Sequence, residues 1–409
     1  MHVSEVGTPL PLTMDFVQNP YPVYELLRQE TPVREVRLPR GLKVWLVTGY
    51  EEARAALADS TLRKNGVEAQ PLFERHLPAG RQRGLFNDSL ASHMLNSDPP
   101  DHTRLRNLVT KAFTARTVQR MKPRIEEITT DLLDQMAAGD DVVDLLAAFA
   151  FPLPVTVICE LLGVPLEDRH DFHAWTRAML SANGGESAYN AGLSMAGYLN
   201  SLVANKRANP RDDLLSGLIE ATDEGDRLTE TELVSMAFLL LVAGHETTVN
   251  LIGNGVLALL RNPDQLAMLR ADPNLISGAI EEFLRYLSPV NMATFRFTTQ
   301  PLRLGDVEIP EGEFVSVALG SADRDEKRFE EPDRLDITRN AGGHLGFGHG
   351  IHYCLGAPLA RLEGQTAIGG LIERFPDLAL ATEPERLTWR DSALIRGLEE
   401  LPVWVRRQN

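Results

Sequence analysis

The sequence predicts a mainly helical protein with a minor β component. Helical periodicity of apolar residues dominates the 409-residue chain, and one stretch without proline runs from Leu228 to about Leu260. The middle of this stretch, MAFLLLVA (236–243), is apolar on every side, which predicts a central buried helix. Strand-like segments are confined to 33–49, 290–320 and 376–407. No shift in composition marks a boundary, so we expect residues 1–409 to form a single domain.

The other elements follow from local periodicity and turn signals. Before the central helix we expect helices at 21–29, 50–58, 99–113, 117–138, 155–162, 168–181 and 189–207. The segment 33–49 alternates around Pro39-Arg40-Gly41, which predicts a hairpin. After the central helix we expect helices at 263–271, 275–287 and 357–373, with strands and turns in the last thirty residues.

Composition and charge restrict the class of protein. Hydrophobic residues make up 43% of the chain and charged residues 24%, as in an ordinary globular protein. The net charge of -16 argues against a nucleic-acid or anionic-membrane surface. The longest strongly apolar stretch, Leu145–Cys159, is shorter than the ~20 residues of a membrane span. With two cysteines and no evident signal peptide, we expect a cytoplasmic protein without a membrane span.

Cys354 lies in a glycine-rich loop, FGHGIHYCLGAP (347–358), directly before a predicted helix. Glycines allow positive φ or close approach to a flat partner. A buried structural cysteine is one interpretation. A zinc site with His344, His349 and His352 is a second, although no other cysteine is near. The third is a haem iron held by a thiolate that the amides of the following helix stabilise.

The central helix carries AGHETT (243–248) in its middle. A metalloprotease HExxH motif would need histidine where Val249 stands, so that interpretation fails. The Thr247 hydroxyl can bond back to the carbonyl of Ala243, which bends a helix and opens a groove. Glu246 and Thr247 beside such a groove could pass protons to a bound ligand. The alternative is a solvated Glu246 and a Gly244 that serves helix packing.

Together these motifs resemble the cytochrome P-450 haem-thiolate monooxygenases, in particular the soluble bacterial branch. The family signature Phe-x-x-Gly-x-x-x-Cys-x-Gly is present from Phe347 to Gly356, and Ala-Gly-x-(Asp/Glu)-Thr-Thr from Ala243 to Thr248. Glu-x-x-Arg is present as Glu282 and Arg285. The resemblance covers the chain from about Asn19 to its end. It implies the P-450 fold, with a long central helix over a buried haem and small sheets at one side.

The resemblance also implies a cofactor and its contacts. The cofactor would be haem b with Cys354 as axial thiolate, and dioxygen would be the co-substrate. The residues implied as contacts of the haem propionates are His102, Arg106, Arg296 and His352. Arginine suits this role because it forms forked, charge-assisted bonds with carboxylates. Arg334 is implied as the third member of a buried ion network with Glu282 and Arg285.

The implied activity is insertion of one oxygen atom of O2 into a C–H bond. Thr247 would bind the dioxygen or its water, and Glu246 would supply protons. No flavin or ferredoxin module is fused to the chain, so we expect electrons from NAD(P)H through a separate ferredoxin reductase and a ferredoxin. The ferredoxin would dock on the cysteine side near Lys111 and Arg116. We expect a monomer.

The substrate is predicted only as a class. The residues that match the family's pocket positions are mostly apolar: Met94, Leu239, Ala243, Met292 and Ile395. The sequence looks closest to actinomycete enzymes that tailor macrolides and related polyketides, so we expect hydroxylation or epoxidation of a bulky lipophilic secondary metabolite. A sterol- or vitamin D-like substrate is the alternative within the family. A non-catalytic haem-thiolate ligand sensor is the alternative from another class.

Overall fold

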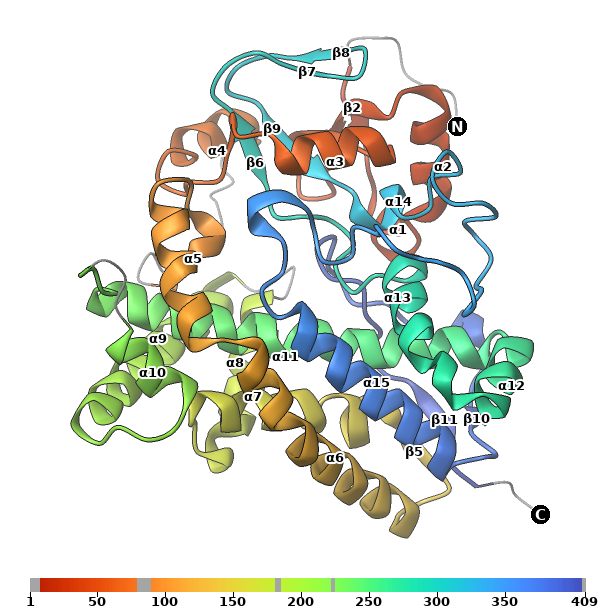
Figure 1. Cartoon of the computed structure of the whole chain (residues 1–409). Helices are drawn as coiled ribbons and strands as arrows, with labels where there is room; N and C mark the ends of the chain where they lie inside the picture. The colour runs from red at the N-terminus through yellow and green to blue at the C-terminus, as the bar shows by residue number, and fades with distance from the viewer. Residues whose placement is uncertain (1–7, 79–89, 181–184, 222–224, 407–409) are drawn as a thin grey trace.

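A computed structural model describes residues 8–78, 90–180, 185–221 and 225–406. Helices form most of the protein, and the sheets lie together at one side (Figure 1). The helices up to the central one are α1 (Met14–Gln18), α2 (Tyr21–Glu30), α3 (Tyr50–Ala58), α4 (Gln70–His76), α5 (Asp101–Ala112), α6 (Ala115–Ala138), α7 (Pro152–Leu162), α8 (Arg169–Leu180), α9 (Gly185–Ala208) and α10 (Leu214–Glu220). The later ones are α11 (Glu230–Leu260), α12 (Pro263–Ala271), α13 (Ile276–Tyr286), α14 (Leu319–Ala322) and α15 (Ala357–Arg374).

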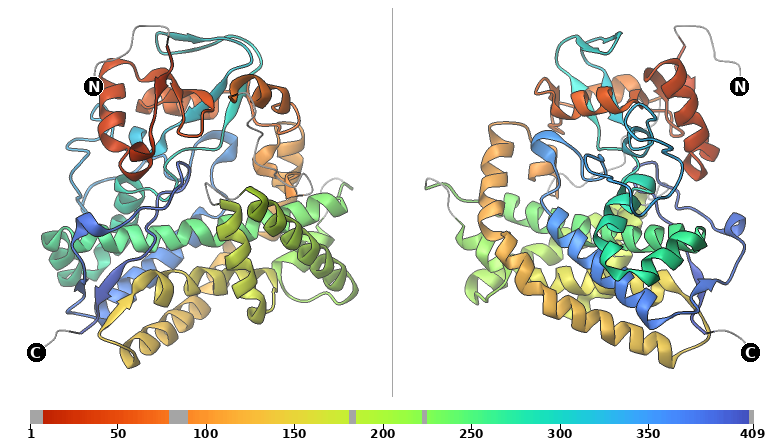
Figure 2. Two further views of the ribbon diagram at one scale, coloured as in Figure 1. Left: turned by 180° about the vertical axis from the view of Figure 1, so that it is seen from behind. Right: turned by 45° about the vertical axis from the view of Figure 1, so that its right-hand side comes forward.

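Helix α11 is the centre of the helical part. Its first turn is fixed by a capping box, in which Thr229 accepts from the Glu232 amide and Glu232 accepts from the Thr229 amide. The helix packs against α7, α9, α13 and α15 and runs across the molecule between them (Figure 2). It is long and apolar enough to cross a membrane, but 67% of its apolar stretch is buried inside the protein. It is therefore the core helix that the sequence predicts.

In the described part of the chain, the strands form three small sheets. The strands are β1 (Leu10–Pro11), β2 (Val33–Arg37), β3 (Lys43–Val47), β4 (Leu62–Arg63), β5 (Val142–Asp144), β6 (Arg296–Thr298), β7 (Leu302–Leu304), β8 (Val307–Ile309), β9 (Phe314–Val317), β10 (Ala379–Leu380) and β11 (Pro402–Trp404). The largest sheet has the order β1-β2-β3-β9-β6-β4. Its β4–β6 pairing places Arg63 opposite Phe297, which brings Lys64 beside Arg296 although 232 positions separate them in the chain.

The predicted elements agree closely with the structure. The helix predicted at 50–58 has those bounds as α3, and the one predicted at 263–271 has those bounds as α12. The hairpin predicted at 33–49 is formed by β2 and β3. Short elements were missed, among them α1, α4, α10 and β4. They are two to seven residues long, too short for a periodic pattern to develop.

One member of the predicted ion network was wrong. Glu282 and Arg285 form a fully buried pair, with Arg285 Nε 2.7 Å from Glu282 Oε2. The third side chain in contact with Glu282 is Arg339, whose Nε lies 3.3 Å from Oε1. The Arg334 side chain is 60% exposed and pairs with Glu331, three residues earlier. Arg334 contributes only its backbone carbonyl, which accepts from Arg285.

Candidate functional site

The cysteine loop lies between the sheet side and the helical side, and it leads directly into α15 (Figure 1). Gly348 and Gly350 have φ angles of +73° and +72°, which favour glycine. A Cβ at Gly350 would lie 2.7 Å from the carbonyl oxygen of Leu57 at the end of α3. The sequence predicts that the glycines of this loop allow positive φ or a close approach to a flat partner. At Gly350 the close neighbour is the backbone of α3. The Cys354 amide donates to the Phe347 carbonyl (2.9 Å), which closes the loop.

The Cys354 sulfur is placed at the start of a helix. Burial raises the pKa of the Cys354 thiol above its usual value, while the backbone amides of Gly356 and Ala357 act in the opposite direction. Arg106 also lowers this pKa, and its Nη2 donates to the Tyr353 carbonyl (2.8 Å). The side chain is only half-buried, so part of its surface faces open space. A metal at the sulfur would complete the stabilisation of the thiolate that the amides begin.

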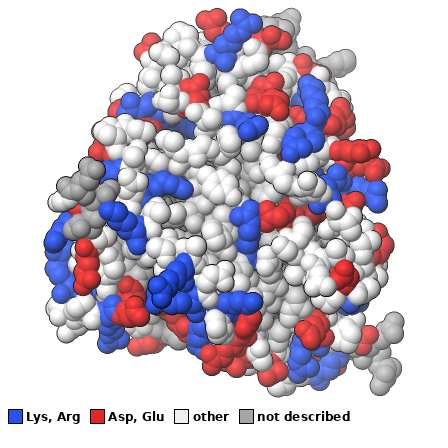
Figure 3. Space-filling view, in the orientation of Figure 1, with Lys and Arg blue, Asp and Glu red and all other residues white. Residues whose placement is uncertain are grey.

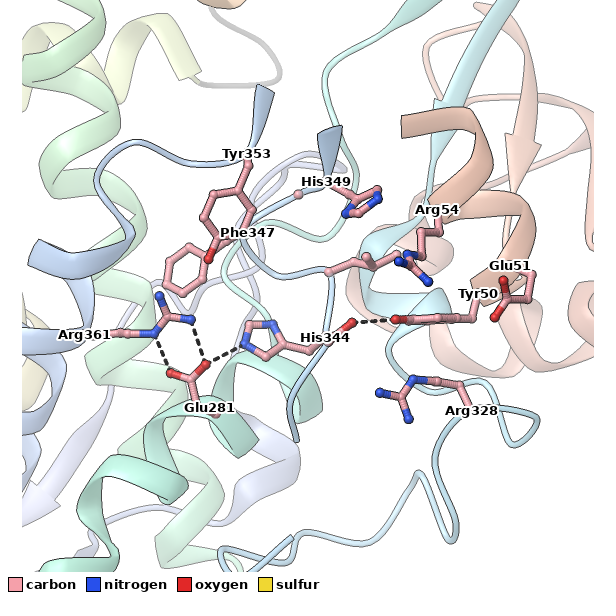
Figure 4. Close-up of a pocket in the computed structure, with 13 residues that line it drawn as sticks. Tyr50, Glu51, Arg54, Glu281, Arg328, His344, Phe347, His349, Tyr353 and Arg361 are labelled. Atoms are coloured by element: carbon pink, nitrogen blue, oxygen red, sulfur yellow. Dashed lines mark hydrogen bonds and ion pairs between the residues drawn. The ribbon is translucent and has the colours of Figure 1, made fainter. Parts of the chain in front are cut away.

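The zinc interpretation has no ligand set. Within the described ranges, no three His, Cys, Asp or Glu side chains gather in a way that could hold a metal ion. His344 instead binds Glu281, with Nε2 3.2 Å from Oε2, and Arg361 donates to both oxygens of that carboxylate. Figure 4 shows this cluster beside a surface hollow of about 490 Å³, which the cysteine loop and α3 border. Burial raises the pKa of Glu281, but the hydrogen bonds from Arg361 and His344 outweigh burial and lower this pKa to about 2.

All four predicted propionate contacts lie in one neighbourhood with a fifth basic residue, Lys64. The His102 and His352 rings are 4.4 Å apart between centroids. Burial and Lys64 lower the pKa of His352 to about 2. Burial lowers the pKa of Arg296 to about 10. Burial and Arg296 together lower the pKa of Lys64 well below its usual value.

This cluster fits a cofactor that carries carboxylates. Among the described residues, neither ring nitrogen of the buried His102 has a hydrogen-bond partner. Asp98 is the acid whose charge raises the pKa of Lys64 and of Arg296. Its carboxylate already accepts hydrogen bonds from Arg63 and from the backbone amides of Lys64 and Asn65. A buried group of cations without a matching acid requires an anion. The two propionates of a haem would supply one, close to the Cys354 loop.

Lys64 was missed by sequence reasoning. It follows the two-residue strand β4, where neither periodicity nor a motif indicates its role. Its ammonium group donates to the Thr294 hydroxyl (2.6 Å), two residues before Arg296. Only the long-range pairing of β4 with β6 could have indicated it.

Helix α11 contributes the predicted alcohol and an opening next to it. Thr247 Oγ1 donates to the Ala243 carbonyl (3.0 Å), which confirms the predicted back-bond. Ala243 is exposed and Thr247 half-buried although both lie in the middle of the core helix, so this face borders open space. A Cβ at Gly244 would lie 2.8 Å from Ile158 Cδ1, so this glycine serves packing against α7. The helix remains continuous from Glu230 to Leu260.

The acid next to this alcohol is not solvated. Glu246 is 6% exposed, and its Oε1 forms an ion pair with Arg390 from the C-terminal segment. The side-chain Nδ2 of Asn250 donates to the backbone carbonyl of Glu246 (2.7 Å) and lies 3.4 Å from Glu246 Oε1. Adjacent residues of a helix point in different directions, so Glu246 lies toward Arg390 while Thr247 lies toward the open space. Arg390 was not expected from the sequence.

The other predicted pocket residues are buried. Met94, Leu239, Met292 and Ile395 are each at most 8% exposed, and they come from four separate parts of the chain. Ile395 pairs with Val290 in an isolated bridge, and Leu239 lies on α11 one turn before Ala243. The sequence predicts that the segments at about 65–96 and 168–195 decide the substrate, and residues 79–89 and 181–184 of these segments lie outside the described residues.

Comparison with known proteins gives one consistent result. A family model described as cytochrome P450 matches residues 189–386. The vitamin D(3) 25-hydroxylase of Pseudonocardia autotrophica is 51% identical over 389 residues, which cover 95% of this chain and 94% of that protein. The 6-deoxyerythronolide B hydroxylase of Saccharopolyspora erythraea is 46% identical, with 94% and 95% covered. The solved structure of the tirandamycin C-bound P450 monooxygenase TamI is 52% identical, with a TM-score of 0.90 over 97% of this chain and 100% of that one.

Proposed function

The chain belongs to the cytochrome P450 family of haem-thiolate monooxygenases, and we propose that the thiolate of Cys354 would hold the haem iron. The observation that carries this proposal is the helix start at Gly356 and Ala357, whose amides act on a half-buried sulfur at the end of a glycine loop. When bound, the haem supplies the binding and reductive activation of dioxygen. The protein supplies the ligand, the cofactor contacts and the proton path.

We propose that five basic residues hold the haem propionates. They are Lys64, His102, Arg106, Arg296 and His352. Arg296 and Lys64 are buried basic groups without a free acid among the described residues around them, so a carboxylate of the cofactor would suit this place better than its apolar edge. His102 has both ring nitrogens available for a hydrogen bond. Arg106 also contacts the backbone next to Cys354, which connects the propionate side to the cysteine loop.

We propose that Thr247 and Glu246 deliver protons to the site. The Thr247 hydroxyl, which already donates to Ala243, can still accept a hydrogen bond on its exposed side. Glu246 is the adjacent acid, and it must leave its ion pair with Arg390 to reach the same space. An enzyme needs such a pair, whereas a passive ligand sensor does not. The pair therefore favours turnover over the sensor alternative.

For the substrate we propose a bulky lipophilic secondary metabolite of the macrolide or polyketide class. A close relative is by name a hydroxylase of 6-deoxyerythronolide B, and the TamI structure contains tirandamycin C. The predicted pocket residues are apolar, which suits such a guest. A vitamin D-like substrate is the second candidate, favoured by the 51% identity to a vitamin D(3) 25-hydroxylase.

We propose that electrons reach the haem from NAD(P)H through a ferredoxin reductase and a ferredoxin. The ferredoxin would dock on the face formed by α5, α6 and α15. Figure 3 shows this face, with several Lys and Arg side chains across its middle. Lys111 and Arg116 are exposed there, at the junction of α5 and α6. Both cysteines are free thiols, which suits a cytoplasmic enzyme, and we expect it to act as a monomer.

The first experiment is the optical spectrum of the purified protein, reduced and then exposed to carbon monoxide. A strongly red-shifted Soret band is expected for the wild type, and Cys354→Ser should remove that shift. A band of histidine-ligated type in correctly folded wild-type protein would refute the thiolate assignment. Titration of the ferric form with a macrolactone and with vitamin D3 then separates the two substrate classes, because only a true substrate should shift the Soret band at micromolar concentration.

A further inference from the structure

The C-terminal segment reaches the proton path directly. Arg390 lies in a hairpin in which its amide donates to the Gly397 carbonyl (2.9 Å), and Trp389 pairs with Leu398 in an isolated bridge. Its guanidinium forms the ion pair with Glu246, 144 positions earlier. The Arg390 side chain is 19% exposed and the Glu246 side chain 7%. The acid is therefore held by one specific cation in a largely dry place.

A polar stripe on α11 fixes the hairpin in position. Glu246, Asn250 and Asn254 lie four residues apart, so they share one face of the helix. Asn254 Nδ2 donates to the Arg396 carbonyl (2.8 Å) and to the Leu287 carbonyl (3.2 Å). A Cβ at Gly397 would lie 1.7 Å from Asn250 Oδ1, so hairpin and helix are in direct contact there. Arg390 cannot move far from Glu246 while these contacts hold.

The ion pair constrains when Glu246 can move. A buried carboxylate that loses its cation is strongly disfavoured, so the charged side chain stays with Arg390. If Glu246 takes up a proton from solvent, the attraction to Arg390 falls and the neutral side chain can rotate. It can then donate that proton on the Thr247 side. The resulting carboxylate returns to Arg390, and only a proton has moved.

We propose that Arg390 is a positioning residue that holds Glu246 between proton deliveries and so controls how often the acid supplies a proton. This inference rests on the proposed role of Glu246. Arg390 itself touches neither cofactor nor substrate in this scheme. Removing its charge should leave a buried carboxyl that remains protonated and no longer cycles.

The test is a double-mutant cycle with Arg390→Gln and Glu246→Gln. Product formed per NAD(P)H and the solvent deuterium isotope effect on turnover are measured. We expect Arg390→Gln to lower product per electron several-fold and to increase the isotope effect. In the Glu246→Gln background Arg390→Gln should change neither. Arg390→Lys keeps the charge and should restore most of the coupling, and Arg386→Gln, an exposed arginine of the same segment, is the matched control.

A readout without turnover accompanies the cycle. The infrared difference between Arg390→Gln and the double variant, both ferric and substrate-free at neutral pH, should contain a protonated-carboxyl band. The difference between wild type and Glu246→Gln should lack that band. If Arg390→Gln does not fold, a cycle of Arg390→Lys with Glu246→Gln serves as the test. The small loss of product per electron expected for Arg390→Lys must then vanish in the Glu246→Gln background.

The outcomes separate the inference from the proposed function. Normal coupling in Glu246→Gln would remove the relay role itself. If Glu246→Gln reduces coupling, the relay role stands. The positioning role alone would then be overturned if Arg390→Gln had no effect, or if its effect persisted in the Glu246→Gln background. Additive losses with no carboxyl band would identify Arg390 as a purely structural contact.

Discussion

At the scale of single residues, we expect the basic cluster to have opposite effects on the haem-free protein and on the holoprotein. Arg296 is 4% exposed, and Asp98, the acid whose charge raises its pKa, is already bound by Arg63. Without the cofactor this charge is buried at a cost, and with the cofactor it would form a charge-assisted bond. We therefore expect Arg296 to weaken the empty fold and to strengthen haem binding.

Arg296→Met should separate these two effects. Replacing a buried unpaired cation with an apolar side chain should raise the free energy of unfolding of the haem-free protein by about 1–3 kcal/mol. The variant should also lose haem faster to an excess of apo-globin. Urea unfolding and haem-transfer rates measure the two quantities. Arg270→Met, an exposed change on α12, should alter neither. Lower apoprotein stability in Arg296→Met would show that Arg296 has a structural partner instead.

Thr247→Ala tests the alcohol of the proton path. The substitution removes the Oγ1 that donates to Ala243, while the methyl-sized side chain keeps the helix intact. We expect NAD(P)H consumption to continue while product per electron falls by at least about tenfold, because a positioned proton-transfer group typically contributes ~10²–10⁴-fold. Peroxide assay together with product analysis measures the ratio. Unchanged product per electron would remove Thr247 from the relay and favour a non-catalytic role for the helix motif.

Sequence reasoning at this scale was limited by distance along the chain. The cysteine loop and AGHETT are local motifs, so Cys354, Glu246 and Thr247 could be proposed as site residues directly from the sequence. Lys64 and Arg390 act through partners more than a hundred positions away, and nothing near them in the sequence indicates those partners. Arg334 and Arg339 lie in the same turn-rich segment, and only the path of that segment decides that Arg339 reaches Glu282.

At the scale of elements, the cysteine loop depends on its contact with α3. Gly350 has φ +72° and no room for a Cβ, because the Leu57 carbonyl oxygen would be 2.7 Å away. This contact holds the loop four residues before Cys354. The position of Cys354, the proposed ligand, thus depends on a helix from the sheet side of the molecule (Figure 1).

Gly350→Ala adds only one methyl group, but it should lower the stability of the protein and disturb the position of the cysteine loop. We expect a loss of about 1–3 kcal/mol from the strained φ and the clash, and a mixture of red-shifted and unshifted Soret bands in the reduced carbon monoxide complex. Gly197→Ala in α9 is the control, because no atom lies within 4 Å of its Cβ position. That change should stabilise the protein by about 0.5–1 kcal/mol and leave the spectrum unchanged. Equal behaviour of the two variants would contradict the packing account.

Asp323, at the end of α14, connects the cysteine loop with the buried ion network. Its Oδ1 accepts from the Leu345 amide (2.6 Å), and its carbonyl accepts from Arg285 (3.0 Å). Among the described residues Oδ2 has no partner. Burial raises the pKa of Asp323 from 3.8 to about 7. The folded protein therefore binds more protons than the unfolded chain between these two values.

This group should make the protein less stable as the pH rises. The Asp323 contribution is fully present below pH 4 and is lost as pH rises to about 7, by at most about 4 kcal/mol. Asp323→Asn stays neutral and keeps an oxygen for the Leu345 amide. Its free energy of unfolding in urea should therefore fall less than that of the wild type between pH 5 and pH 8. An identical fall in both proteins would show that Asp323 is ionised in the fold throughout this range.

At the scale of the whole molecule, the two sides of the predicted haem site are built from different elements. The residues of the proposed proton path come from the middle of α11 and from the C-terminal hairpin. The cysteine side comes from the loop before α15, with α6 packed against that helix and α5 leading into α6 (Figures 1 and 2). This division predicts that charge changes on the α5–α6 face alter electron delivery without altering the chemistry beyond α11.

Replacing both Lys111 and Arg116 with glutamate tests this division. Both side chains are exposed, so the fold should tolerate the change. The new negative charges should repel an acidic ferredoxin and reduce ferredoxin-supported turnover at low salt by about 10-fold or more, with the difference shrinking at high ionic strength because surface charges are screened. Peroxide-driven turnover bypasses the ferredoxin and should stay unchanged. Arg303→Glu, on the distant β7–β8 sheet, is the control for a general charge effect. A double variant that loses both kinds of turnover equally would place the damage in the haem site and would rule out this face as the docking surface.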